Sequence, residues 1–563
     1  MCGIFALLNN SNINPKVVNE EFMKGQGRGP EFSKLDFSYI KMTLGFHRLA
    51  INGLNEASNQ PLVINDIVLI CNGEIYNYKQ LYKMMDIKPQ TGSDCEVIIH
   101  LFLKYGIEQM LTMLDGVFAF ILFDNRISED LNSKIYVARD PLGVRPLYYL
   151  KNSLNISKSD IMYGFASELK CLEKFYNTNI NNYSIEQFQP GTYSIYNLSS
   201  KVLSIWIPIR ENIVYFIPSF SYISSIEDET NYVPFLDNIY KNINYYLTSA
   251  VEKRCLTTER PIACLLSGGL DSSLIAALVS EYYKKNNSDK LLETYSIGLE
   301  GSEDLKYAQV VANYIGSKHT TIIVTEQEMF DAIPEVIEKI ESYDTTSVRA
   351  SIGNYLLGKY IAANSDAKVI FNGDGSDELF GGYLYMNNCP DDIEFDMETR
   401  RILKDIHSFD VLRSDKSISS NGLEPRTPFL DKSFVNYVLS IPSYFRNHKN
   451  IGKIEKFLLR NSFSKEKILP DEILWRKKEA FSDGVSSHGR SLYTILQEKI
   501  GKKLENVITP FTEGIQTEKY YYRQIFDQLF PNCDSIVPYF WMPKYTNATD
   551  PSARTLTFYE KKL

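Results

Sequence analysis

Residues 264–273 read Cys264-Leu-Leu-Ser-Gly-Gly-Leu-Asp-Ser-Ser273. An apolar run, Ile262–Leu266, precedes the two glycines, and a helical pattern, Leu270–Asn286, overlaps and follows them. Glycines let the backbone turn sharply and approach an anion closely, and the start of a helix directs its amides and its positive dipole end at that anion. The stretch therefore predicts a phosphate-binding loop between a strand and a helix.

Asp271 follows this loop directly and would repel a phosphate unless a cation lay between them, so the loop implies Mg²⁺. The spacing is not that of a Walker loop, because no Gly-Lys-Ser/Thr is present. A Gly/Ser turn with Asp271 as a helix cap is the alternative. A second loop, Phe371–Tyr383, carries three acidic residues and four glycines, which suits a metal–triphosphate site. It lacks the ligand spacing of a calcium loop, and a plain acidic turn is its alternative.

Strand and helix patterns alternate around the first loop. Further strands are expected at 293–299, 320–324 and 368–372, and a helix at 305–315. Such alternation predicts a parallel sheet with ligands beyond the carboxyl ends of its strands.

The residues before Trp206 follow a different pattern, of short strands with two or three helices. Strands are expected there at 2–8, 68–72, 116–123 and 134–139. We predict a first domain at 1–206, a linker at 207–234 that is rich in Pro, Ser, Glu and Asp, a second domain at 235–548 and a flexible tail at 549–563.

The bulk composition is that of a globular protein. The chain has 563 residues, of which 44% are hydrophobic and 23% charged, and a formal net charge of −9. An acidic balance argues against a nucleic-acid or anionic-membrane partner. No apolar run approaches the roughly 20 residues of a membrane helix, and no basic residue precedes the short apolar stretch at the N-terminus, so we expect neither a membrane span nor a secretory signal.

Eight cysteines are spread along the chain without a CxxC pair, which argues against zinc and against a disulfide framework and favours a reducing cytoplasm. Cys2 is unusual, because removal of Met1 would place a thiol and an α-amine on one residue. An α-amine has a pKa of about 8 and could accept the proton of that thiol. A buried small hydrophobic residue is the alternative interpretation of Cys2.

Taken together, these strings resemble a known family. Ser267–Ser273 is similar to the pyrophosphatase loop (PP-loop) of enzymes that adenylate an oxyanion. Cys2-Gly-Ile, Arg28-Gly-Pro30, Asn72-Gly-Glu-Ile-Tyr-Asn77 and Thr91-Gly-Ser-Asp94 are similar to N-terminal-nucleophile glutamine amidotransferases. In this order they resemble the glutamine-hydrolysing asparagine synthetases. The likeness continues through residues 343–349, 425–431 and 475–484. It implies a two-domain α/β protein, with an N-terminal αββα four-layer sandwich and a C-terminal doubly wound parallel sheet of the PP-loop type with helical additions.

By this resemblance, Cys2 attacks the amide carbon of glutamine while its α-amine relays the proton. Asn72 and Gly73 form the oxyanion hole, and Arg48 pairs with the substrate carboxylate. Ser93–Glu96 also fits a capping box for a helix at 95–104. The glutamine-binding positions are Arg48, Leu49, Ala50, Ile51, Asn52, Asn72, Gly73, Glu74 and Asp94, with Glu74 and Asp94 facing the ammonium.

In the second domain, the resemblance implies that Asp271 and Asp377 bind Mg²⁺ and that Lys478 neutralises the leaving pyrophosphate. Asp374 stands where the family has a glutamate implicated in adenylate formation. The nucleotide positions are Leu265, Ser267, Gly268, Gly269, Asp271, Ser272, Ile297, Asn372 and Gly373, and the positions for aspartate or the ammonia passage are Thr346, Ser347 and Arg349.

The resemblance also has departures, because Gly27 and Glu31 stand where the family has His and Asp around Arg-Gly-Pro. The expected activity is ATP-dependent conversion of aspartate to asparagine through a β-aspartyl-AMP intermediate, with ammonia channelled from glutamine, in a cytoplasmic enzyme that forms a homodimer. A ring-closing β-lactam synthetase, a thiol-transferring ATPase acting on tRNA and a non-catalytic relative are the alternatives. Cys2 argues against the β-lactam synthetase, which needs no glutaminase nucleophile, and the acidic net charge argues against the tRNA enzyme. The non-catalytic relative is disfavoured because Asp271, Asp377 and Lys478 are retained.

Overall fold

The fold of this chain is taken from a computed structural model. It describes residues 1–126, 133–152, 161–178, 180–199, 204–218, 232–286, 290–452, 454–478, 484–486, 490–504 and 514–551. Parts of three predicted segments lie outside these ranges, namely 219–231 of the linker, 479–483 of the family-like stretch 475–484, and 552–563 of the tail.

The first domain contains two antiparallel sheets of six strands each. One has the order β10-β8-β9-β1-β3-β2 and the other the order β12-β11-β7-β6-β5-β4. The strands of the first sheet are β1 (Gly3–Leu8), β2 (Phe32–Tyr39), β3 (Met42–Arg48), β8 (Tyr148–Asn152), β9 (Tyr163–Ala166) and β10 (Tyr183–Gln187). Those of the second are β4 (Leu62–Ile64), β5 (Ile67–Ile75), β6 (Gly116–Asp124), β7 (Lys134–Arg139), β11 (Thr192–Ser199) and β12 (Ile205–Val214).

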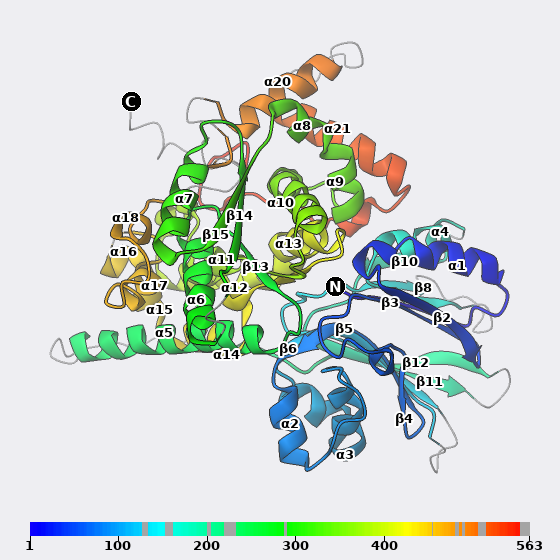
Figure 1. Cartoon of the computed structure of the whole chain (residues 1–563). Coiled ribbons are helices and arrows are strands. Elements are labelled where there is room, and N and C mark those ends of the chain that lie inside the picture. Colours follow the sequence, from blue (N-terminus) through cyan, green and yellow to red (C-terminus); the bar gives the residue numbers. More distant parts are fainter. Residues whose placement is uncertain are drawn as a thin grey trace.

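The two sheets pack face to face and helices cover both outer faces (Figure 1). On β1, Ile4 and Ala6 point into the core between the sheets, while Phe5 and Leu7 belong to the core under the outer helices. This alternation is the two-residue period of a strand that is buried on both faces. The helices are α1 (Pro15–Met23) and α4 (Glu173–Asn177) on one side and α2 (Tyr78–Met85) and α3 (Glu96–Met113) on the other. The predicted αββα sandwich is confirmed.

The second domain is built on a five-stranded sheet of order β15-β14-β13-β16-β17, in which every pair is parallel. Ala263 and Leu265 of β13 face one helical layer, while Ile262 and Cys264 face the other, so the sheet is doubly wound as predicted. The strands are β13 (Ile262–Leu265), β14 (Glu293–Gly298), β15 (Lys318–Ile323), β16 (Val369–Phe371) and β17 (Glu424–Arg426).

Helices flank this sheet and extend the domain toward the C-terminus. They are α5 (Tyr232–Leu256), α6 (Leu270–Asn286), α7 (Glu303–Ile315), α8 (Glu326–Asp331), α9 (Ile333–Ile340), α10 (Thr345–Asn364), α11 (Ser376–Phe380), α12 (Asp392–Asp405), α13 (Asp410–Ser419), α14 (Lys432–Ser440), α15 (Ser443–Arg446), α16 (His448–Ile451), α17 (Phe457–Ser462), α18 (Asp471–Leu474), α20 (Leu492–Leu504) and α21 (Gly514–Leu529).

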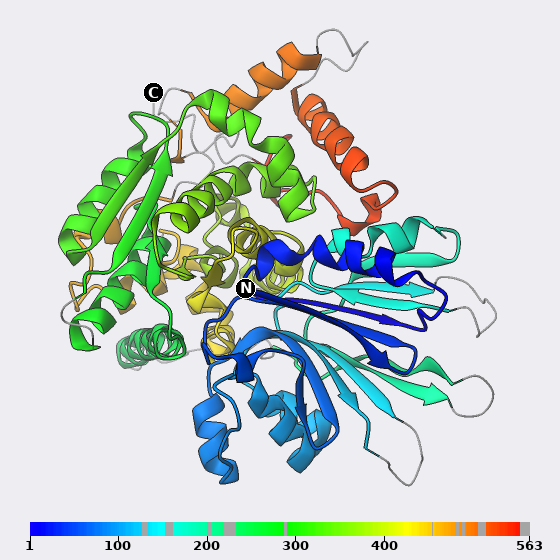
Figure 2. The same cartoon turned by 45° about the vertical axis from the view of Figure 1, so that its right-hand side comes forward.

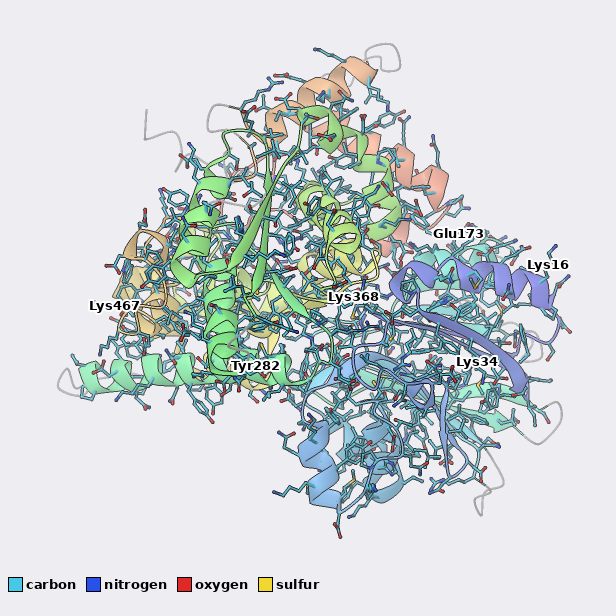
Figure 3. The ribbon with its side chains drawn as sticks, viewed as in Figure 1. Lys16, Lys34, Glu173, Tyr282, Lys368 and Lys467 are labelled. Carbon is cyan, nitrogen blue, oxygen red and sulfur yellow. The ribbon has the colours of Figure 1, made fainter. Side chains whose placement is uncertain are left out.

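The domains lie side by side, and the N-terminus lies where they meet (Figures 1 and 2). Lys368, the residue before β16, lies on the side of the second domain that faces the first (Figure 3). Arg260, just before β13, pairs with Glu31 of the first domain. The amino ends of these parallel strands therefore face the first domain, and their carboxyl ends, which carry the predicted ATP loops, point away from it.

Two predicted boundaries differ from the structure. The expected linker starts at 207, but β12 continues to Val214 and pairs with β11. Pro208 is tolerated there because β12 is an edge strand. The expected flexible tail starts at 549, but Asp550 is fully buried and pairs with Arg349. No helix in the described ranges combines the length and the apolar character that a membrane span requires.

Candidate active sites

Cys2 lies immediately before β1 at the domain boundary. Its Sγ donates to the carbonyl of Leu49 at 3.6 Å, and the carbonyl of Cys2 accepts from Arg28 Nε at 2.9 Å. Burial raises the pKa of the Cys2 thiol, and the nearby terminal ammonium opposes that rise. Met1 is present, so the nitrogen of Cys2 is a peptide amide here. The Met1 amine donates to the Leu423 carbonyl, and burial lowers its pKa to about 5.

Asn72 and Gly73 lie on β5, and Ser167 connects this strand to β1. Ser167 Oγ accepts from the amide of Ile4 at 3.0 Å and from Asn72 Nδ2 at 3.4 Å. Asn72 is completely buried, and its Oδ1 lacks a hydrogen-bond partner among the described residues. A Cβ at Gly73 would come within 2.6 Å of the Val117 carbonyl, so only glycine fits there. An oxyanion site needs donors, and Asn72 Oδ1 is an acceptor, so the Asn72 atom that could serve such a site is Nδ2, which donates to Ser167 at 3.4 Å.

Arg48 has four protein acceptors in the segment that follows it. Its guanidinium donates to the carbonyls of Asn52, Gly53 and Asn55 and to Asn59 Oδ1. Burial lowers its pKa. Arg48 therefore shapes the 52–59 segment, and its pairing with a substrate carboxylate stays a prediction.

Two buried acids, Glu74 and Asp94, share one donor. Asn52 Nδ2 lies 2.8 Å from Glu74 Oε2 and 3.5 Å from Asp94 Oδ1. Burial raises the pKa of Asp94 to about 6 and raises that of Glu74 well above its ordinary range, with the charge of Asp94 adding to the latter shift. Arg426 of the second domain lies 3.3 Å from Glu74 and opposes that shift. Arg426 also pairs with Glu424 at 2.8 Å, so Glu74 and Asp94 have only a share of its positive charge, and a second cation beside them would be favoured.

The predicted capping box at Ser93–Glu96 is wrong. Glu96 accepts from the amides of Gln90 and Thr91 at 2.7 and 2.6 Å instead of reaching back to Ser93. It closes the turn before α3, and Asp94 accepts from the Ile75 amide at 2.7 Å.

The second site surrounds a cavity of about 240 Å³ at the carboxyl ends of β13, β14 and β16. In the loop after β13, Gly268 has φ +75°, and a Cβ there would lie 2.5 Å from the Ala308 amide. Ser267 Oγ and Ser272 Oγ lie 2.9 Å apart. Of the residues predicted for this site, those lining the cavity are Leu265, Ser267, Gly269, Asp271, Ser272, Ile297, Thr346, Arg349, Asn372, Gly373, Asp374, Asp377 and Lys478.

Two of the predicted residues do not line this cavity. Gly268 forms the turn itself and accepts from Arg476 through its carbonyl at 3.0 Å. Ser347 lies in the first turn of α10, where its amide and Oγ both donate at 2.8 Å to Oδ2 of Asp344, the residue that caps this helix.

Asp271 and Asp377 come together across one lysine that the sequence analysis did not single out. Lys456 Nζ lies 2.5 Å from Asp271 Oδ2 and 2.6 Å from Asp377 Oδ1, and Lys478 Nζ pairs with the other oxygen of Asp377. Burial raises the pKa of Asp377, but these two lysines outweigh it and hold that pKa below its ordinary value. A Cβ at Gly382 would lie 2.1 Å from Lys456 Cε, so this glycine makes room for the lysine.

The donor set fits Mg²⁺ as an ATP-bound ion. Two carboxylates face the cavity and already share one cation, and magnesium is commonly held by one or two carboxylates together with substrate phosphates. Within the described residues, His, Cys, Asp and Glu form no group of three or more that could hold a metal ion. A dedicated all-protein metal cage is therefore not part of the described site.

Two further cavity residues are tied to protein partners. Asp374 Oδ1 lies 3.2 Å from Arg413 Nη2. Arg349 is bound by two buried carboxylates, with Nε and Nη2 on Glu518 and Nη1 and Nη2 on Asp550. The two carboxylates that bind Arg349, those of Glu518 and Asp550, belong to the C-terminal part of the chain, where the sequence predicted no functional residue.

Comparisons with known proteins place the chain among characterised sequences. A family described as "Asparagine synthase" matches residues 242–394 and 387–553, and one described as "Glutamine amidotransferase domain" matches residues 1–204. The chain is 41% identical over 584 residues to the "Asparagine synthetase [glutamine-hydrolyzing]" of Gallus gallus, with 100% of both chains covered. It is 39% identical over 589 residues to the protein of that name from Homo sapiens, again with 100% of both covered. A solved NMN synthetase from Francisella tularensis is 12% identical, with a TM-score of 0.24 and coverage of 54% of this chain and 98% of that one.

Proposed function

The chain belongs to the family of glutamine-hydrolysing asparagine synthetases, and from this premise we propose which of its residues carry each half of the reaction. It is a ligase that forms asparagine with ATP and takes nitrogen from glutamine.

In the first domain, Cys2 without Met1 attacks the glutamine amide carbon through Sγ, and its α-amine takes the thiol proton and passes it to the departing ammonia. Water then attacks the resulting thioester carbon, which releases glutamate and returns the thiol of Cys2. The Asn72 side chain and the Gly73 amide stabilise the oxyanion; losing one such donor typically costs about 2.7–4 kcal/mol of barrier. Glu74 and Asp94 hold the substrate ammonium. The arrangement of two buried acids around one arginine supports this assignment.

In the second domain, an oxygen of the β-carboxylate of aspartate attacks the α-phosphorus of ATP, and the bond to the β-phosphate oxygen breaks to release pyrophosphate. Ammonia then attacks the β-carbonyl carbon and AMP leaves with that carboxylate oxygen. The loop after β13 cradles the phosphates, and Lys456 and Lys478 neutralise the departing pyrophosphate. Thr346 and Arg349 face aspartate from the cavity wall. Asp271 and Asp377 would hold Mg²⁺, which when bound screens the phosphate charge.

One observation carries the synthetase assignment, namely the pairing of Asp271 and Asp377 with Lys456 and Lys478 around the cavity. The test supplies aspartate labelled with ¹⁸O in its carboxylates, together with ATP and ammonium. We expect one labelled oxygen in AMP for each asparagine formed. Label in inorganic phosphate, or ADP as the product, would refute the adenylate.

We also propose that the first domain extends at least to Val214, because β12 completes the second sheet, and that the second domain contains α5 and extends at least to Asp550, which pairs with Arg349. A cytoplasmic location is consistent with eight cysteines that are all free thiols. A homodimer stays a prediction, which light scattering of the purified protein would test.

A further inference from the structure

Ala50, Ile51 and Asn52, which the family resemblance assigns to glutamine, and the next residue, Gly53, are held by one short segment of the other domain. This segment, Thr257–Arg260, which we call the clamp, joins α5 to β13. The Ile51 carbonyl accepts from the Glu259 amide at 3.0 Å. The Gly53 amide donates to Glu259 Oε1 at 2.8 Å, and Asn52 Nδ2 donates to the Thr257 carbonyl at 3.1 Å.

Arg260 completes the clamp by binding the Ala50 carbonyl directly and by pairing with Glu31, which binds the Ala50 amide. Its Nε donates to the Ala50 carbonyl at 2.8 Å, and its Nη2 donates to Glu31 Oε1 at 2.7 Å. The other oxygen of Glu31 accepts from the Ala50 amide, also at 2.7 Å. Every residue from Ala50 to Gly53 thus has a hydrogen bond to the clamp, and Ala50 is also bound by Glu31, which is itself paired with Arg260.

This arrangement uses Glu31, which stands where the resembling family has Asp. The side chains of Glu31 and Arg260 are only 31% and 29% exposed, so water competes in part for their charges. Glu31 holds the amide of Ala50 and Arg260 holds its carbonyl, and the ion pair between these two side chains fixes both contacts relative to each other. A loop whose backbone is fixed in advance binds its ligand without an ordering cost.

We propose that Glu259 and Arg260 of the synthetase domain are positioning residues for glutamine, acting through the backbone of Ala50–Gly53. They touch neither reacting centre in this arrangement. The clamp lies directly before β13, whose far end carries the phosphate loop, so the segment that fixes the glutamine loop is continuous with the strand that presents ATP. The inference rests on the proposed function for the glutamine-binding role of residues 50–52.

The test measures glutamine hydrolysis and ammonia-dependent asparagine formation in Arg260→Gln and Glu259→Ala. We expect the glutamine KM to rise about three- to tenfold in each, with kcat within about twofold, because charge-assisted bonds that orient the loop are lost while the nucleophile remains. Glu259→Gln keeps an oxygen for the Gly53 amide and should raise KM by less than about twofold. Arg126→Gln, which removes an exposed pair with Asp124, is the matched control for loss of an arginine.

A merely structural role gives a different result. If the residues only join the domains, ammonia-dependent synthesis should fall in parallel with glutamine use, and that outcome overturns the proposal. An unchanged glutamine KM in both variants also overturns it. A Cys2→Ala background allows glutamine affinity to be measured by calorimetry without turnover. If ammonia-dependent synthesis were absent from the unmodified protein, the proposed synthetase function would fail, while glutamine affinity would still report on the clamp.

Discussion

Replacing Lys456 with methionine removes the cation that joins Asp271 and Asp377 but keeps a side chain of similar length. Lys456 is 2% exposed and both carboxylates are 16% exposed, so the charges are largely removed from water. Breaking a buried ion pair costs about 3–5 kcal/mol. Asp271 keeps the Ser376 hydroxyl at 2.8 Å and Asp377 keeps Lys478, so we expect the lower end, about 3 kcal/mol.

For a domain of this size, 1 kcal/mol corresponds to roughly 2–4 °C in Tm, so the second domain of Lys456→Met should melt about 6–12 °C lower. Calorimetry of the protein without nucleotide and with chelator measures this. Millimolar Mg²⁺ should then restore much of the loss in the variant and change the unmodified protein little, because the ion can take the place that the ammonium left. Lys465→Met is the control, since that lysine is 82% exposed and lies 3.5 Å from Asp237.

The reasoning is refuted if Lys456→Met melts within about 2 °C of the unmodified protein in chelator. It is also refuted if Mg²⁺ stabilises both proteins equally, because the carboxylates would then not be the place where the ion acts.

Three further predictions concern the two sites. Cys2→Ala should abolish glutamine hydrolysis and leave ammonia-dependent asparagine formation within about twofold, and retained hydrolysis would remove Cys2 as the nucleophile. Glutamine should bind the Cys2→Ala protein about tenfold more weakly for each pH unit below 6, because burial raises the pKa of Asp94 to about 6 and protonation removes the charge that faces the ammonium. Calorimetry measures this affinity, which should not change with pH below 6 when Asp94→Asn is added. Asp374→Glu should keep or raise the synthetase rate, since a longer acid still reaches Arg413; a fall to background in a pyrophosphate-release assay would show that the loop depends on aspartate.

The sequence predicts elements well where the signal is local. The helix at 270–286 and the strand at 134–139 have the predicted bounds, because the glycine loop and the turn residues at their ends are adjacent in the chain. The strand at 205–214 was missed because an edge strand tolerates Pro208 and exposes its polar residues, which makes it read as a linker.

Functional residues, too, could be predicted from the sequence where they are adjacent to one another in the chain. Ser267 and Asp271 are contiguous with a strand and a helix, so their loop could be predicted from spacing. Lys456 could not, since it is 185 positions from Asp271 and only the tertiary fold brings them together. The sequence feature related to Lys456 is Gly382, because a side chain at that position would collide with the lysine.

The electrostatics of the first site depend on the second domain. Glu74 and Asp94 together bring two acidic groups into a buried place, and burial alone would keep them protonated. Arg426 on β17 supplies one positive charge to Glu74 and also donates to the Thr257 carbonyl at 2.9 Å, the acceptor of Asn52 in the clamp. Because Glu424 also binds Arg426, at 2.8 Å, the two acids have only a share of that charge, which leaves room for the single positive charge of an amino-acid ammonium. The synthetase domain therefore supplies both the backbone clamp and the countercharge of the glutamine site, and separating the domains should impair glutamine recognition even with Cys2 intact.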